Sequence, residues 1–103
     1  MRLYYSPLAG CQLKGIKCHI IEKFKSPSAA KNVVLQIERA CRILQDYPDI
    51  GFSFTSDDDA EEIGALPIGD YVALYKHDSE NIMVVSIEDA RSDWKSLYVL
   101  EEE

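Results

Sequence analysis

Two Ser-Pro dipeptides, each followed by a long amphipathic pattern, constrain the fold of this chain more than any other feature. A serine oxygen caps a helix well, and proline suits the first helical position because its missing N–H is not needed there. Ser6-Pro7 and Ser26-Pro27 both fit this start signal. The first is followed by apolar residues at spacings of three and four, which share one stripe: Ala9, Leu13, Ile16, Ile20 and Phe24. We predict a helix over residues 7–24.

A second stripe follows the second start signal. Its members are Ala30, Val33, Val34, Ile37, Cys41 and Leu44. The helix is expected to reach about Asp46, because Tyr47-Pro48 then forces the residue before proline out of the helical region. Only one or two residues separate the two helices, which predicts an antiparallel helical hairpin.

Short segments rich in β-branched and aromatic residues surround this hairpin. Residues 49–62 are expected to form a loop with one short irregular strand, and Asp78–Asn81 a hairpin turn. Residues 91–98 are expected to form a short helical turn, and the three glutamates at 101–103 a solvated tail. The predicted strands are Arg2–Tyr5, Ile63–Ile68, Tyr71–His77 and Ile82–Glu88.

The fold class that follows is α+β, with the order β-α-α-β-β-β. Each helix has an apolar stripe that must be buried, and the sheet offers one face for both. We therefore expect the helical hairpin to pack on a mainly antiparallel sheet that the first strand joins. With 103 residues, the chain is expected to form a single domain over residues 1–103.

The charges divide sharply along the chain. Residues 1–50 contain eight Lys/Arg and four Asp/Glu, whereas residues 51–103 contain three Lys/Arg and fourteen Asp/Glu. Such an imbalance bears on binding partners and not on the fold. An acidic second half repels phosphate, so extended nucleic-acid binding there is disfavoured.

The compartment is also indicated by the sequence. No apolar run approaches the roughly 20 residues that a membrane span requires, and residues 1–7 lack the apolar core of a secretory signal. Three cysteines without a CxxC pair suggest reduced thiols. We expect a cytoplasmic protein with no membrane partner.

Five segments carry a pattern that is shared with a known family. They are Tyr5–Ala9, Ser26–Ala30, Ile43–Gly51, Leu66–Tyr75 and Ala90–Trp94. In this order and spacing the chain resembles the RelE/ParE toxin superfamily of bacterial type II toxin–antitoxin (plasmid stabilisation) pairs. The long helical hairpin is closer to the ParE branch. The resemblance implies a RelE/ParE-like toxin that inhibits growth and that a cognate antitoxin protein neutralises.

The resemblance also implies one of two activities: RelE-type members cut mRNA in the ribosomal A site, and ParE-type members poison DNA gyrase. Cleavage of RNA without a metal requires a base, an acid and cations around the phosphate. The family's basic positions are occupied here by Gly64, Val72 and Asp89, and Arg91 alone fits its place. We therefore expect gyrase binding ahead of mRNA cleavage by a ribosome-dependent endonuclease, and we assign no catalytic residues. A non-toxic module that retains only antitoxin binding is a third reading.

Two candidate contact residues follow the last predicted strand. Arg91 is a candidate functional cation, or else it pairs with Asp89 or Asp93 on the surface, where such a pair contributes little. Trp94 is a candidate partner anchor, since tryptophan is enriched at binding hot spots, or else it closes the core over the last strand.

Three further candidates lie on the central predicted hairpin. Tyr71 and Tyr75 alternate along one strand and share a face, where they either pack or face a ligand. His77 lies beside Asp78 at the mouth of the turn, where it is either exposed or part of a histidine–carboxylate pair.

No metal or cofactor is indicated by the sequence. Cys11 and Cys18 lie opposite the apolar stripe of the first helix and are expected to be exposed, whereas Cys41 lies within the second stripe and is expected in the core. These residues lack the spacing of a zinc site. Asp57-Asp58-Asp59 lacks the glycine of a calcium loop and is expected to be solvated.

The acidic balance predicts an unusual antitoxin. Toxins of this superfamily are commonly basic and their antitoxin segments acidic, whereas this chain carries a net charge of −7. By charge complementarity, we expect its antitoxin to bind through a segment rich in Lys and Arg.

Overall fold

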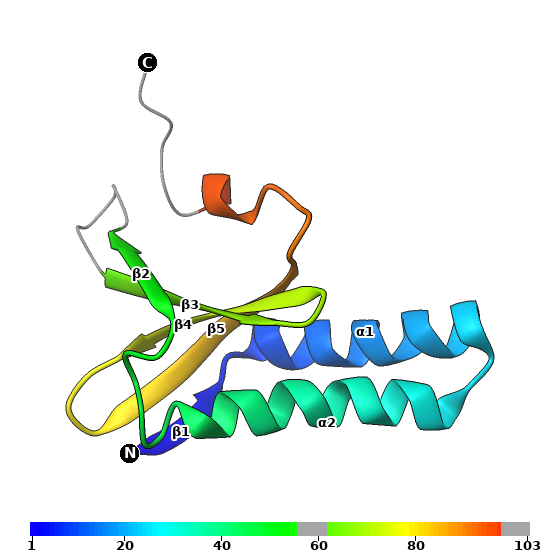
Figure 1. Cartoon of the computed structure of the whole chain (residues 1–103), viewed down its shortest axis with the longest axis horizontal. Coiled ribbons are helices and arrows are strands. Elements are labelled where there is room, and N and C mark those ends of the chain that lie inside the picture. The colour runs from blue at the N-terminus through cyan, green and yellow to red at the C-terminus, as the bar shows by residue number, and fades with distance from the viewer. Residues whose placement is uncertain (56–61, 98–103) are drawn as a thin grey trace.

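Two helices cover one face of a five-stranded sheet in the computed structural model, which describes residues 1–55 and 62–97 (Figure 1). The helices lie side by side, and a short 3₁₀ helix lies on the opposite side of the sheet (Figure 1). The elements in chain order are β1 (Arg2–Tyr5), α1 (Pro7–Phe24), α2 (Pro27–Ile43), β2 (Phe52–Thr55), β3 (Glu62–Ile68), β4 (Tyr71–His77), β5 (Asn81–Asp89) and η1 (Trp94–Leu97). The predicted α+β class is confirmed.

Both predicted helix starts are confirmed by their capping contacts. The Ser6 hydroxyl accepts a hydrogen bond from the Ala9 N–H at 3.0 Å, and the Ser26 hydroxyl accepts one from the Ala29 N–H at 3.1 Å. Between the helices, Lys25 takes the left-handed conformation with φ of 54°. This conformation reverses the chain direction within two residues and produces the helical hairpin.

The second helix ends earlier than the sequence indicates. We predicted that it reaches about Asp46, whereas α2 ends at Ile43 and the next three residues form turns. The N–H groups of Leu44, Gln45 and Asp46 donate to carbonyls three residues back instead of four. This tightening satisfies the last carbonyls of the helix before Pro48 ends the helical path.

The sheet has the strand order β1-β5-β4-β3-β2. β1 runs parallel to β5, and the other three pairings are antiparallel. The expectation that β1 joins the later sheet is confirmed, and the structure shows that its neighbour is the last strand. The irregular strand expected within residues 49–62 is β2, which pairs with β3. Asp57–Asp59 and Glu101–Glu103 lie outside the described residues.

The start of α1 extends the parallel edge of β5, because β1 pairs with only the first four residues of that strand. The Ser6 N–H donates to the Val84 carbonyl at 2.9 Å, and the Ser6 hydroxyl donates to the Val85 carbonyl at 2.5 Å. Six residues later, the Gln12 side-chain oxygen accepts the Ile87 N–H at 2.7 Å. These contacts fix α1 on the sheet.

Both faces of the sheet are covered by apolar side chains. On the helical side, the core consists of Ala9, Ile37, Cys41, Ile68, Ala73, Val84 and Ile87. On the other side, Trp94 packs over Ile63, Ala65, Val72 and Leu74. Neither helix in the described residues is long and apolar enough to cross a membrane.

The three cysteines differ in their environment as predicted, since Cys11 and Cys18 are exposed and Cys41 is buried. Burial raises the pKa of the Cys41 thiol to about 11, which keeps it protonated and unreactive. We predict that Ellman's reagent at pH 8 modifies two thiols in the folded protein and the third only in denaturant. Rapid modification of three thiols without denaturant would contradict the placement of Cys41.

Candidate functional site

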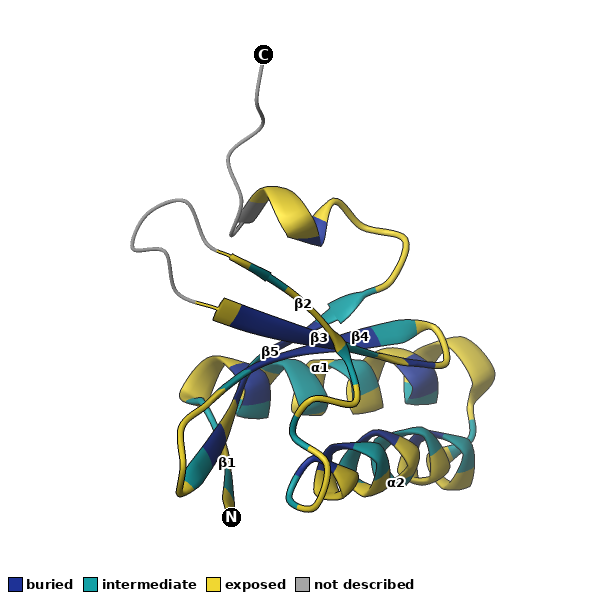
Figure 2. Ribbon diagram, turned by 60° about the vertical axis from the view of Figure 1, so that its left-hand side comes forward, coloured by how far each residue is buried: buried dark blue, intermediate teal, exposed yellow. Residues whose placement is uncertain are grey.

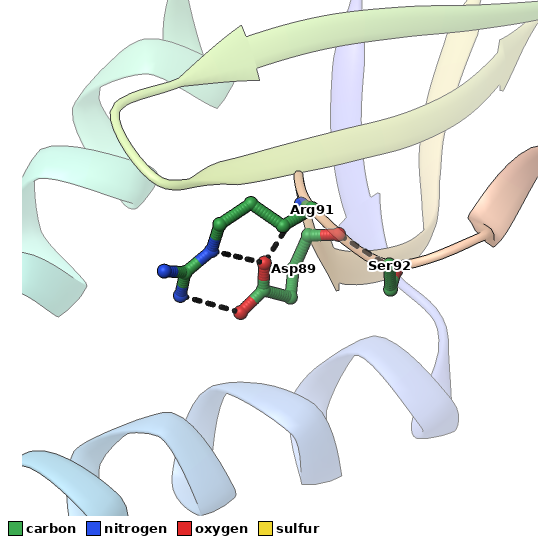
Figure 3. A network of polar contacts seen from close by, with 3 residues as sticks. All are labelled: Asp89, Arg91 and Ser92. Atoms are coloured by element: carbon green, nitrogen blue, oxygen red, sulfur yellow. Dashed lines mark hydrogen bonds and ion pairs between the residues drawn. The ribbon is translucent and has the colours of Figure 1, made fainter.

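The candidate residues fall into three separate places, the first of which is the end of β5. Arg91 donates from Nε and Nη2 to the two carboxylate oxygens of Asp89, both at 3.2 Å, and its backbone N–H donates to the same carboxylate at 2.8 Å (Figure 3). The Ser92 hydroxyl donates to the Asp89 carbonyl at 2.7 Å and fixes the turn. Of the two partners considered for Arg91, Asp93 and Asp89, the structure shows the pair with Asp89.

This clamp holds both partners in their charged forms. Hydrogen bonds from Arg91 lower the pKa of the Asp89 carboxyl, and Asp89 in turn raises the pKa of the Arg91 guanidinium. The Arg91 side chain is still 82% exposed, so a partner can approach it. Because Asp89 neutralises it, Arg91 offers hydrogen-bond donors without a net local charge.

Tyr71 belongs to the same end of the sheet. It pairs across the β4–β5 ladder with Asp89, and its ring packs against the core on the helical side. Burial raises the pKa of its hydroxyl, and the nearby carboxylates of Asp89 and Asp70 raise it further. The structure therefore brings Tyr71 and Arg91 together, as a half-buried aromatic ring beside an exposed guanidinium.

Tyr75 and His77 lie at the opposite end of β4. The Tyr75 ring is almost completely buried, and its hydroxyl donates to the Pro48 carbonyl at 2.8 Å and accepts the Gly51 N–H at 3.3 Å. Burial raises the pKa of this hydroxyl, although the Gly51 N–H opposes the effect. Tyr75 is thus a packing residue that attaches the segment after α2 to the sheet.

Two glycines make this placement of Tyr75 possible. Gly64 lies beneath the ring, where an added Cβ would come within 2.3 Å of the Tyr75 Cζ atom. At Gly51, an added Cβ would come within 2.4 Å of the Ala65 carbonyl oxygen. Real Cβ atoms do not approach other heavy atoms so closely, so both positions require glycine.

His77 lines a pocket beside Tyr75. Its Nε2 atom lies 3.4 Å from a carboxylate oxygen of Asp49, and its ring stacks on that of Tyr75 with centroids 6.4 Å apart. The pocket has a volume of about 170 Å³, and Glu62 and Lys76 also line it. The histidine–carboxylate pair therefore uses Asp49, from the loop after α2, in place of the neighbouring Asp78.

Asp78 instead shapes the β4–β5 turn. Its carboxylate accepts the N–H groups of Glu80 and Asn81, both at 2.8 Å. These hydrogen bonds lower its pKa. Asp78 is therefore a turn residue, and the carboxylate that pairs with His77 is that of Asp49.

Trp94 lies on the face of the sheet that the helices leave open. It is 8% exposed, and the rings of Phe52 and Phe54 approach it with centroids at 6.4 and 6.0 Å. The Lys95 ammonium lies 5.8 Å from the Trp94 ring centroid. Of the two roles considered for Trp94, the structure supports closing a core. The prediction that this core lies over the last strand was wrong, because Trp94 covers residues of β3 and β4.

The positions of the missing basic residues have other structural uses. Gly64 is covered by the Tyr75 ring, Val72 is 2% exposed within the Trp94 core, and Asp89 holds Arg91. A lysine or arginine at any of these positions would disrupt the packing or the ion pair that the present residue makes. No three His, Cys, Asp or Glu side chains among residues 1–55 and 62–97 are grouped to hold a metal ion.

Sequence reasoning missed two members of the pocket, Asp49 and Glu62. Both were assigned to a loop region, and no periodic pattern relates them to His77. The glycines at 51 and 64 were a usable signal, because an isolated glycine in a strand often marks a close backbone or ring approach.

A comparison with protein families decides the classification of this fold. The sequence model of the ParE toxin of the type II toxin–antitoxin system parDE matches residues 3–94. The chain belongs to the ParE toxin family. It is therefore the toxin component of a type II toxin–antitoxin module, as the resemblance implied, and family membership implies an antitoxin partner.

A solved structure supports the fold of this ParE family member. A chain of the chromosomal ParDE toxin–antitoxin system from P. aeruginosa is similar, with a TM-score of 0.74 and 19% sequence identity. The match covers 88% of this chain and 97% of that chain. No curated protein matches the sequence.

The Tyr75 anchor generates a stability prediction. Tyr75→Phe leaves the Pro48 carbonyl and the Gly51 N–H without their partner, so we expect a loss of about 1–3 kcal/mol in the free energy of unfolding. Gly64→Ala forces a methyl group into the Tyr75 ring and should cost a similar amount, about 1–3 kcal/mol or more. Urea denaturation measures both changes.

Tyr4→Phe is the matched control, because Tyr4 is 41% exposed and its hydroxyl contacts only the exposed Arg2 guanidinium. We expect this variant to stay within about 0.5 kcal/mol of the parent protein. Equal stability of the Tyr75→Phe and Tyr4→Phe variants would rule out an anchoring role for the Tyr75 hydroxyl.

Proposed function

We propose that this ParE family toxin inhibits growth by binding DNA gyrase and not by cutting RNA. The supporting observation is the loss of the cationic set: the ring over Gly64, the buried Val72 and the carboxylate of Asp89 occupy the positions where a ribonuclease needs basic side chains. Without those cations, the negative charge of a phosphorane has no stabilising partner. Binding to a protein target requires no such set.

The His77 pocket does not restore ribonuclease chemistry. It supplies a histidine and carboxylates that can exchange protons, yet Asp49 and Glu62 would repel an approaching phosphate. Lys76 also lines the pocket, but a single lysine against two carboxylates leaves little positive charge to neutralise a phosphorane.

The contact surface that we propose is the end of β5, where Arg91 is exposed next to the half-buried Tyr71. Arginine and tyrosine are the residue types that dominate binding hot spots. The whole chain, residues 1–103, acts as one toxin domain in the cytoplasm, where gyrase and the antitoxin are found.

A non-toxic module that retains only antitoxin binding is the second candidate. The observation that favours it is the Asp89 clamp, which neutralises Arg91, the one cation that stands where the RelE/ParE resemblance places a basic residue. A disarmed toxin would retain the fold and bind its antitoxin but leave gyrase unaffected.

The gyrase assay separates these functions. We predict that the purified chain inhibits DNA supercoiling by gyrase and that induced expression arrests growth with SOS induction. Arg91→Ala should weaken inhibition roughly fivefold or more if Arg91 is a contact residue, whereas Lys95→Ala on the opposite face should not. Harmless expression with unimpaired supercoiling would reject gyrase binding and support the disarmed module.

The acidic second half of the chain leads to a prediction about the antitoxin. We propose that its binding segment is rich in Lys and Arg and docks against the sheet, where acidic side chains outnumber basic ones. Its affinity should then fall as salt is raised from 50 to 500 mM, because salt screens exposed charges. An acidic antitoxin segment with salt-insensitive affinity, measured by isothermal titration calorimetry, would contradict this proposal.

A further inference from the structure

The structure sorts the charges of the chain into two layers. The helical hairpin, residues 7–43, contains seven Lys/Arg and only two glutamates. Nine of the eleven acidic residues within residues 1–55 and 62–97 lie outside the two helices, in the strands and the segments that connect to them. The sheet lies on one side of the helical hairpin (Figure 1). The net charge of −7 therefore conceals a basic surface formed by the two helices.

Five cations form the centre of this surface, which we call the basic helical face. They are Lys14 and Lys17 of α1 and Lys31, Arg39 and Arg42 of α2, and all five are exposed. Both helices carry stretches of exposed residues (Figure 2). Within residues 1–55 and 62–97, the salt bridges are His77–Asp49 and Arg91–Asp89, so these five cations have no carboxylate partner there. Their charges are available to an external anion.

The apolar residues of the hairpin argue for a polyanion and against an amphipathic peptide. A helical peptide that docks on such a face needs apolar anchors along its length. The large hydrophobic side chains exposed on the helices are Leu8, Phe24 and Ile43, all of which lie at helix ends. Between these ends, the exposed residues of α2 include the polar Asn32 and Gln36 as well as the cations.

The dimensions of the face fit a phosphate backbone. Lys31 and Arg42 are eleven residues apart, so they span roughly 16 Å of helix axis. Duplex DNA carries one charge per about 1.7 Å of axis, so several phosphates lie within that length. The acidic layer is screened from them, because the Debye length at 0.1 M salt is about 10 Å.

We propose that the basic helical face binds the phosphate backbone of duplex DNA without sequence preference. Lysine and arginine side chains would neutralise phosphates and release condensed counterions, which is the driving force for such binding. The inference is independent of the gyrase proposal, because it concerns other residues and a different ligand.

Fluorescence anisotropy with a labelled 20-base-pair duplex of arbitrary sequence tests this inference. We expect saturable micromolar binding of the full chain at 50 mM salt. If about four phosphates are neutralised, the logarithm of the binding constant should fall with the logarithm of the salt concentration with a slope near −4. Absence of binding at 50 mM salt would overturn the proposal.

Charge reversal locates the binding surface. The double variant Lys31→Glu/Arg39→Glu should bind the duplex at least about tenfold more weakly and lose about two units of the salt slope. Lys95→Glu, on the other side of the sheet, is the control and should bind almost as the parent chain does. All variants change exposed residues, and circular dichroism verifies that they fold.

Two further results would also reject the basic helical face as a DNA-binding surface. The first is an equal loss of affinity for the duplex, per unit of charge changed, in Lys95→Glu and in the double variant. That result would indicate an effect of net charge and not of a particular surface. The second is tighter binding of polyglutamate than of the duplex at equal charge concentration, which would indicate an acidic protein partner.

Discussion

The attachment of the segment after α2 to the sheet depends on one aromatic side chain. The Tyr75 ring lies over Gly64, and its hydroxyl bonds both the Pro48 carbonyl and the Gly51 N–H. These contacts direct the chain from the helical layer into β2 at one edge of the sheet. At the other edge, Ser6 and Gln12 extend β5, so α1 is held by polar contacts as well as by its apolar stripe. The helical hairpin is thereby fixed at both of its junctions with the sheet.

The same packing explains why the three positions that the RelE/ParE resemblance assigns to basic side chains hold none. A basic side chain at position 64 would displace the Tyr75 ring, and one at position 72 would enter the apolar core beneath Trp94. At position 89, a carboxylate holds Arg91 in place. Stability of the sheet and a cationic active site therefore compete for the same positions in this chain. What the sheet retains is an exposed guanidinium beside a tyrosine, which is suited to recognition.

The helices were predictable because their determinants are local. Serine caps, prolines at the first position and apolar spacing identified α1 at both ends and α2 at its start, whereas the end of α2 moved because a tighter turn satisfied its last carbonyls. The parallel pairing of β1 with β5 joins residues about 80 positions apart, and the sequence indicated only that β1 enters the later sheet. The geometry of the candidate site was harder to predict from the sequence. Alternation placed Tyr71 and Tyr75 on one face, but it could not show that Tyr75 bonds Pro48 or that Asp49 reaches His77.

We propose that this ParE family member acts through binding surfaces and does not cleave RNA. The most direct test adds the purified chain to ribosomes that are translating a defined mRNA and maps the mRNA ends by primer extension. We expect the mRNA to remain full-length when the chain is present in excess over the ribosomes. Cuts at codons in the ribosomal A site would contradict it, and they would show that the fold supplies acid, base and charge neutralisation from other residues.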